Sequence, residues 1–151
     1  MSGRTPGRSG NAHPNIYPYD SFATGTTPVF LAVGNDRQFR LLCEHLGCPQ
    51  LVADERFATA GQRSHHRDAL KPLLEQALQA SDGPALADAL MAIGVPAAPV
   101  LGVDAALNHP HTLHREMVVE MEGGYRGLGA PVKLSRTPAS YRHAPLAEGD
   151  S

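Results

Sequence analysis

The sequence predicts an α+β fold, in which a small antiparallel sheet packs on helices and flexible segments lie at both ends. Apolar runs typical of short strands lie toward the two ends of the chain, whereas helical periodicity is confined to its middle. The 15 Gly and 13 Pro among 151 residues predict short elements joined by many turns and exclude a long helical bundle or coiled coil. This length is sufficient for one domain whose core needs no disulfide or metal.

The N-terminal part of the chain is expected to pass from a polar lead into a strand. Residues 1–12 contain almost nothing apolar, which is typical of a disordered linker remnant. Residues 13–19, HPNIYPY, should be extended because each proline disfavours helix in the residue before it. The short apolar run VFLAV at residues 29–33 predicts a buried strand. Either Asn35 or Asp36, in the polar turn that follows, can cap the next helix.

A first helix follows, and its end is marked by Gly47 and Pro49. Its apolar positions recur at helical spacing and are Phe39, Leu42, Cys43 and Leu46. Residues 51–62 are expected to be irregular, with Phe57 as the residue that anchors them to the core.

Two more helices are predicted before residue 95. One should begin at a Ser64 cap and run to Ala80, with Pro72 either kinking it or marking its start. The other begins at Asp82-Gly83-Pro84 and ends at Gly94. The expected buried positions are Leu70, Leu73, Leu74, Ala77 and Leu78 in one helix and Leu86, Ala89, Leu90 and Ile93 in the other.

The C-terminal part is expected to return to strands. Residues 97–101 should be extended, and residues 104–108 should form a short helical turn closed by Pro110. Weak alternation predicts a strand over residues 117–121, and the run APVKL predicts another over residues 130–134, with a Gly-Gly turn between them.

Charge and cysteine usage narrow the possible partners. A formal net charge of -2 argues against a general nucleic-acid or anionic-membrane binder, and no apolar run of transmembrane length occurs. Cys43 and Cys48 are expected to be free thiols in a reducing cytoplasm. Cys43 lies on an apolar helix face as a packing residue, and Cys48 follows the helix C-terminus, where the dipole disfavours a thiolate. Neither cysteine is therefore predicted to be catalytic.

No motif in the chain defines a reaction by itself. His109, His111 and His114 could bind zinc or copper, but Pro110 breaks the helix that would align them, so no metal site is predicted. The phosphate-binding, dinucleotide-binding and nucleophile-elbow motifs are not found in the sequence. Four basic residues could meet a phosphate-bearing ligand or lie on a solvated face: Arg115, Arg126, Lys133 and Arg136.

The most informative carboxylate is Asp20, which lies between Tyr19 and Phe22. Aromatic neighbours on both sides could partly desolvate it, whereas a local turn with Ser21 is the structural alternative that the sequence favours. By composition and spacing alone, the residues define a small α+β segment and no activity.

Several strings in order along the chain resemble the family III CoA transferases, a group that includes formyl-CoA transferase, carnitine CoA-transferase and the related 2-methylacyl-CoA racemases. The strings cover nearly the whole chain. They are residues 10–24 (GNAHPNIYPYDSFAT), 30–39 (FLAVGNDRQF), 54–63 (DERFATAGQR), 94–101 (GVPAAPVL), 109–120 (HPHTLHREMVVE), 129–138 (GAPVKLSRTP) and 143–150 (HAPLAEGD).

The resemblance implies that this chain is the C-terminal part of a longer, two-domain enzyme. A large Rossmann-like domain would bind CoA, a small α+β domain would lie within it, and two subunits would interlock as a homodimer. Residues 13–122 would be the small domain, and residues 123–151 would return toward the missing large domain. The nucleophilic aspartate would lie in the missing N-terminal half, so no catalytic residue is assigned here.

The resemblance also implies substrates and a place for them. The enzyme would move CoA from an acyl-CoA to a carboxylic acid through an aspartyl-CoA intermediate, with CoA as a substrate and no other cofactor. In formyl-CoA transferase a glycine run forms a lid in this region, whereas residues 13–24 of this chain carry prolines and tyrosines. The expected substrate-facing residues are therefore Tyr17, Tyr19 and Asp20. Part of a racemase-like enzyme and an inactive small domain that binds a partner are the alternatives.

Overall fold

The computed structural model describes residues 10–145, and it divides after Val100 into two compact units. The N-terminal unit, residues 10–100, and the C-terminal unit, residues 101–145, are each described by themselves. The α+β class predicted from the sequence is confirmed. The expected small domain of residues 13–122 spans this division, and its boundaries stay a prediction. The expected disorder of residues 1–12 lies largely outside the described residues.

The sheet of the N-terminal unit has three antiparallel strands in the order β1-β2-β3. These are β1 (Tyr19–Phe22), β2 (Val29–Ala32) and β3 (Ala97–Pro99). In the register of the first pair, Asp20 lies opposite Leu31 and Phe22 lies opposite Val29, and all four side chains are buried. Alternate residues point to opposite faces. The residues between them, such as Tyr19, therefore form the other, partly exposed face.

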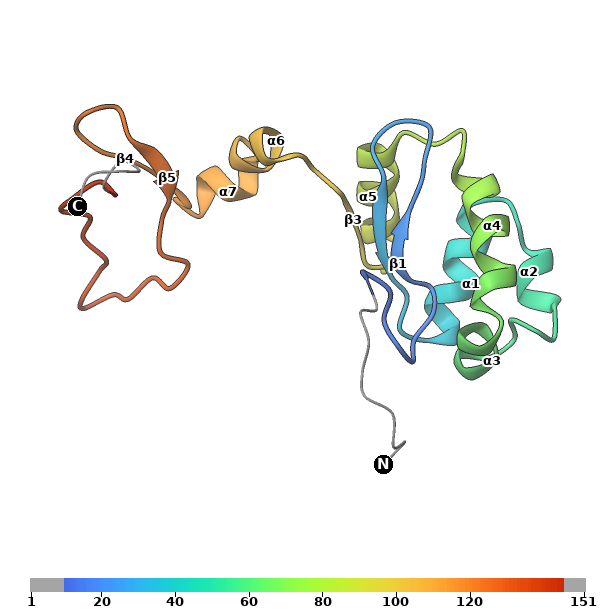
Figure 1. Ribbon diagram of the computed structural model, residues 1–151. Helices are drawn as coiled ribbons and strands as arrows, with labels where there is room; N and C mark the ends of the chain where they lie inside the picture. Colours follow the sequence, from blue (N-terminus) through green and yellow to red (C-terminus); the bar gives the residue numbers. More distant parts are fainter. Residues whose placement is uncertain (1–9, 146–151) are drawn as a thin grey trace. The chain divides into compact units, whose positions relative to one another are not determined.

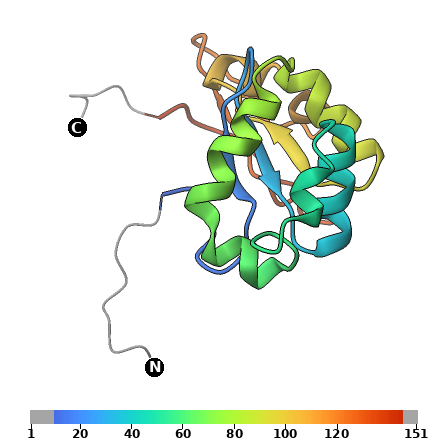
Figure 2. The same cartoon turned by 90° about the vertical axis from the view of Figure 1, so that its right-hand side faces the viewer.

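Five helices lie on one face of this sheet, as Figures 1 and 2 show. They are α1 (Asp36–His45), α2 (Gln50–Ala53), α3 (Ala60–His65), α4 (Arg67–Leu78) and α5 (Gly83–Ala92). The predicted starts of α1 and α5 are confirmed by side-chain caps. Asn35 Oδ1 accepts from Gln38 N at 2.9 Å, and Asp82 Oδ2 accepts from Ala85 N at 3.3 Å. These bonds satisfy helix donors that have no partner within the helix.

The core lies between the sheet and the helices. Its main side chains are Phe22, Val29 and Leu31 from the strands, and Phe39, Leu42, Leu70, Leu74, Leu78, Leu86 and Leu90 from the helices. Phe57, the expected anchor of residues 51–62, is fully buried, which confirms that prediction. The expectation that this stretch is irregular is wrong at both of its ends, because residues 51–53 belong to α2 and residues 60–62 belong to α3. The expected burial of Ile93 is wrong, because Ile93 follows the last turn of α5 and is exposed, while Ala87 is buried instead.

The helix expected from Ser64 to Ala80 is two helices. Thr59, not Ser64, caps α3, and its hydroxyl accepts from Gln62 N at 3.3 Å. His66 then leaves the helical conformation and separates α3 from α4. The Ser64 hydroxyl accepts a hydrogen bond from the Arg67 guanidinium at 2.9 Å. Pro72 lies inside α4, so the expectation that it could mark a helix start is also wrong.

The C-terminal unit consists of two short helices and a hairpin: α6 (Val103–Leu107), α7 (Pro110–His114), β4 (Val118–Glu120) and β5 (Arg126–Leu128). The expected helical turn and the expected strand over residues 117–121 are present. Pro110 was expected to close the first of these helices, and it is also the first residue of α7. At that position a backbone N–H would have no partner within the helix, so proline is well tolerated.

The strand predicted over residues 130–134 is wrong. Gly123 and Gly124 both adopt positive φ, at 85° and 82°, and reverse the chain directly after β4. Val118 consequently pairs with Leu128, which places the second strand immediately after the turn. Residues 130–134 lie beyond Val118, the first residue of β4, and they form no strand within residues 10–145.

Two further properties of the described residues bear on assembly. In the described part of the chain, none of the helices is long and apolar enough to cross a membrane. The C-terminal unit exposes a group of large apolar side chains, which are Val103, Leu113, Leu128, Val132, Leu134 and Tyr141.

The Gly83→Ala variant is expected to be less stable by about 1–3 kcal/mol, the usual cost of overpacking a tight site. A Cβ atom at Gly83, the first residue of α5, would stand 1.9 Å from the carbonyl oxygen of Thr27. Either the loop before β2 or the start of α5 must then move. Urea unfolding of the two chains, followed by far-UV circular dichroism, measures this loss.

The matched control is Gly61→Ala in α3, where an added Cβ meets nothing within 4 Å. This change is expected to increase the free energy of unfolding by about 0.4–1 kcal/mol, because alanine restricts the unfolded chain. Equal effects of the two substitutions would contradict the close approach at Gly83.

Candidate functional site

Three basic side chains on α3 and α4 hold the segment that contains the candidate residues. Arg63, Arg67 and Lys71, here called the cation row, are spaced four residues apart. The Arg63 guanidinium donates to the carbonyl oxygen of Tyr17 at 3.1 Å, and that of Arg67 donates to those of His13 and Pro14 at 3.2 and 2.8 Å.

Lys71 extends the cation row onto strand β1. Its ammonium donates to Asp20 Oδ2 at 2.9 Å and to the carbonyl oxygen of Ser21 at 3.4 Å. Each cation also lies close to an aromatic ring: Arg63 lies 4.4 Å from Phe39, Arg67 lies 5.6 Å from Tyr17, and Lys71 lies 5.5 Å from Phe22. Cation–π contacts of this kind add to the hydrogen bonds. Residues 13–22 are therefore held through both their backbone and their rings.

Tyr17 and Asp20 lie on the helix-covered side of the sheet. Tyr17 is 1 % exposed, and its hydroxyl has no hydrogen-bond partner among residues 10–145. Burial, together with the nearby carboxylates of Asp20 and Glu75, raises the pKa of Tyr17, so the hydroxyl stays protonated. Asp20 Oδ1 accepts from the backbone N–H of Ser21 at 2.8 Å. This is the local contact with Ser21 that the sequence favoured.

Tyr19 lies on the opposite, open face of the sheet. Its ring meets that of Phe30 edge to face at 5.5 Å between centroids, and the ring of His13 lies 5.2 Å away. His13 is itself fixed, because its Nδ1 accepts from the backbone N–H groups of Asn15 and Ile16. His13, Tyr19 and Phe30 form an aromatic cluster on this face. The structure thus brings Tyr17 and Asp20 together and separates Tyr19 from both.

The Tyr17→Phe variant is expected to be as stable as the parent chain or up to about 2 kcal/mol more stable, because a buried, unpartnered hydroxyl is costly. Thermal or urea unfolding measures the difference, with Tyr19→Phe as the control on the half-buried face. A loss of more than about 1 kcal/mol in Tyr17→Phe would show that the hydroxyl is hydrogen-bonded, since a typical bond contributes that much.

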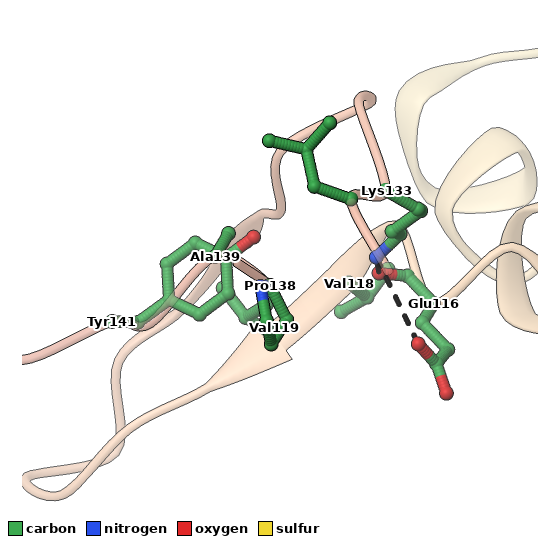
Figure 3. A pocket seen from close by; sticks show the side chains of 8 residues that line it. Glu116, Val118, Val119, Lys133, Pro138, Ala139 and Tyr141 are labelled. Atoms are coloured by element: carbon green, nitrogen blue, oxygen red, sulfur yellow. Dashed lines mark hydrogen bonds and ion pairs between the residues drawn. The ribbon is translucent and has the colours of Figure 1, made fainter. Parts of the chain in front are cut away.

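The C-terminal unit contains a separate pocket of about 340 Å³, shown in Figure 3. Val118, Val119, Pro138 and Tyr141 provide most of its apolar wall. Lys133, at its edge, donates to the carbonyl oxygen of Glu116 at 3.0 Å and lies 3.8 Å from the carboxylate of the same residue. Because Glu116 is close to Lys133, its carboxylate offsets the positive charge of the ammonium. The pocket therefore attracts an anionic ligand only weakly.

The basic residues considered as a phosphate site are largely engaged by their own unit. Arg115 donates to the carbonyl oxygen of Pro131 at 3.3 Å, and Arg126 donates to Asn108 Oδ1 at 3.1 Å. Arg126 also lies 3.7 Å from the Glu120 carboxylate. Arg136 is exposed. These contacts favour the solvated-face interpretation over a phosphate site.

The histidine cluster has a structural role at the start of α7. His109 Nδ1 accepts from the backbone N–H of His111 at 3.2 Å and so caps the helix that Pro110 begins. Within residues 10–145, no group of three or more His, Cys, Asp or Glu side chains is placed to hold a metal ion.

The cation row was missed by reasoning from the sequence. The sequence does show the pattern: basic residues recur every four positions, at 63, 67 and 71. The buried Leu70 and Leu74 lie in the same region. A basic row beside an apolar stripe usually indicates a solvated face. Only the packed structure shows that Arg63 is 0 % exposed.

The N-terminal unit is a small α+β domain. Helices cover one face of its three-stranded sheet, and the cation row holds its N-terminal segment. The sequence model of CoA-transferase family III matches residues 1–151. The chain belongs to this family, as the resemblance of its strings implied.

Individual relatives agree with this assignment. Acetyl-CoA:oxalate CoA-transferase of Acetobacter aceti is 39% identical over 134 residues, which are 89% of this chain and 34% of the relative. Succinate–glutarate CoA-transferase of Agrobacterium fabrum is 35% identical over 93% of this chain and 36% of its own length. The chain therefore spans about a third of the curated relatives that it matches.

A solved structure supports the fold. The crystal structure of a CAIB/BAIF family protein from Brucella suis is similar to this chain, with a TM-score of 0.82 and 39% identity. The match covers 91% of this chain and 36% of the Brucella protein.

Proposed function

We propose that this chain is the C-terminal part of an enzyme that transfers CoA between an acyl-CoA donor and a carboxylic acid. The family match over residues 1–151 and the relatives named as CoA-transferases carry the proposal. The nucleophile would be an aspartate outside this chain, and it would form an aspartyl-CoA thioester during each transfer. The covalent intermediate divides the transfer into steps that each take place at the enzyme's own carboxylate, so the acyl-CoA donor and the acceptor acid need not react directly with each other.

The acid that accepts CoA is proposed to be a dicarboxylic acid. Oxalate, succinate and glutarate, the acids in the names of the two relatives described above, each carry two carboxyl groups. The names of these relatives favour transfer over racemisation of a 2-methylacyl-CoA.

The candidate residues would form one wall of the acyl site. Tyr19, half-buried in the aromatic cluster, would contact the acyl group directly, because its face of the sheet is not covered by helices. Tyr17 and Asp20 would position the strand that carries it, through their burial and the Asp20–Lys71 ion pair. Residues 13–24 would thereby help to exclude water, which would otherwise hydrolyse the covalent intermediates.

The assembly that we propose follows the family resemblance. Residues 13–122 would act as the small domain and residues 123–151 would return to the large domain, in an interlocked homodimer. Exposed apolar side chains in the C-terminal unit, such as Val132 and Leu134, are suited to being covered there. Free thiols at Cys43 and Cys48 support a reducing compartment such as the cytoplasm.

The test compares the 151-residue chain with a longer chain encoded by the same gene region. Each is incubated with acetyl-CoA or succinyl-CoA and with oxalate, succinate or glutarate, and new thioesters are measured by liquid chromatography. We expect transfer by the longer chain and none by the 151 residues alone, because the nucleophile lies outside them. Borohydride reduction of the longer chain, after incubation with acyl-CoA alone, locates the aspartyl-CoA thioester.

Two outcomes would contradict the proposal. Turnover by the 151 residues alone would place the nucleophile inside this chain. Exchange of the α-proton of a 2-methylacyl-CoA with heavy water, without any transfer of CoA, would indicate the racemase alternative.

A further inference from the structure

The two cysteines of the chain meet at the C-terminal end of α1. Gly47, with φ of 67°, ends the helix there. Cys48 N donates to the carbonyl oxygen of Cys43 at 2.9 Å, and Gly47 N donates to that of Glu44 at 3.2 Å. These two bonds define a Schellman motif, which brings the side chains of the residues at the positions of Cys43 and Cys48 into contact.

Cys43 and Cys48 are both free, buried cysteines, and their thiols interact with each other. This interaction raises the pKa of Cys43, which burial raises further, and it lowers the pKa of Cys48. The sequence had suggested that the helix dipole would disfavour a thiolate at Cys48. The neighbouring Cys43 thiol acts in the opposite direction, because its interaction with Cys48 lowers the pKa of Cys48.

Access from solution distinguishes the two sulfur atoms. Cys43 is 0 % exposed, whereas Cys48 is 6 % exposed. Cys48 also lines a pocket of about 300 Å³ together with Leu73 and Gln76 from α4. A small oxidant can approach Cys48 through this pocket, while Cys43 lies on the core side of the same pair.

We propose that Cys43 and Cys48 form an oxidation site, in which a hydroperoxide oxidises Cys48 and Cys43 then closes an intramolecular disulfide. The Cys48 sulfur attacks the peroxide, the O–O bond breaks, and water or an alcohol leaves with a sulfenic acid remaining on Cys48. The Cys43 sulfur then attacks the Cys48 sulfur, the S–O bond breaks, and the Cys43 proton leaves with the hydroxide as water. The peroxide is reduced, and two thiols are oxidised to one disulfide.

The backbone at the end of α1 is suited to this bond. Disulfides need Cα atoms close together, and the hydrogen bond from Cys48 N to Cys43 O already joins the two backbones. Oxidation should therefore leave the helix content of the chain unchanged. The proposal does not depend on CoA transfer, because neither cysteine takes part in the proposed acyl site.

The test uses the intact 151-residue chain and hydrogen peroxide. Oxidation is expected to lower the mass by two hydrogen atoms and to remove both thiols from maleimide labelling in denaturant, with an unchanged far-UV spectrum. The protease Glu-C cleaves after Glu44, between the cysteines. The two fragments that carry Cys43 and Cys48 should remain linked until a reductant is added.

Single-cysteine variants assign the order of the steps. Cys43→Ser should accumulate a sulfenic acid at Cys48 that reacts with dimedone, whereas Cys48→Ser should show little reaction at Cys43. In the unsubstituted chain, peroxide that leaves both thiols labelled, or that links two chains instead, would overturn the proposal. That measurement does not depend on whether the variants fold.

Discussion

The Arg63→Ala variant is expected to lose about 2–6 kcal/mol of unfolding free energy, because each of two buried carbonyl groups left without a donor costs about 1–3 kcal/mol. The Arg63 guanidinium is fully buried and donates to Asp36 Oδ1 at 2.7 Å and to the carbonyl oxygens of Tyr17 and Phe57 at 3.1 and 3.0 Å. Alanine would leave the two carbonyl groups without their donor and open a cavity beside Phe39. Urea unfolding followed by circular dichroism measures the loss.

Two further variants separate charge from packing. Arg63→Met fills most of the volume but still leaves the carbonyl groups of Tyr17 and Phe57 unbonded, so it should lose less than Arg63→Ala. Arg37→Ala removes an exposed arginine from α1, and a change within about 0.5 kcal/mol is expected, as for most surface substitutions. Equal stability of Arg63→Ala and Arg37→Ala would contradict the structural role assigned to Arg63.

The Phe57→Ala variant is expected to lose about 3–5 kcal/mol, the usual cost of removing a large aromatic ring from a core. Phe57 is 0 % exposed and is the anchor of the stretch between α2 and α3. Its backbone also takes part in the core, because its carbonyl oxygen accepts from Arg63 at 3.0 Å. The same unfolding measurement gives the loss.

Phe57→Leu is the matched control, and it should lose less than about 1.5 kcal/mol because most of the apolar volume is kept. Equal losses in Phe57→Ala and Phe57→Leu would contradict the role of the buried ring as an anchor.

Helix ends were the part of the fold that could be predicted well. Asn35 and Asp82 cap α1 and α5 as their positions indicated, and Gly47 ends α1. A cap is a hydrogen bond between residues two or three positions apart, so the residues that form it lie together in the sequence. The division at His66 was missed because helical periodicity continues across it.

The arrangement of the candidate residues was not predicted, and their place in the substrate site stays a prediction. Residues 13–24 carry the resemblance to family III, and the comparison with known proteins confirms the family. The sequence did not show that Tyr19 faces away from Tyr17 and Asp20, because β1 was not predicted. Its pairing with β2 depends on contacts that no local pattern reports.

The sequence by itself determined the family, the α+β class and the local turns, because each depends on residues that are near one another or on strings that can be matched directly. The tertiary structure alone decided which polar groups are buried. From the sequence alone, Arg63 would be placed on the surface. In the folded chain the carbonyl oxygen of Tyr17, 46 positions earlier, accepts a hydrogen bond from it in the core. Burial is a sum over neighbours that are distant in sequence, so only the folded chain determines it.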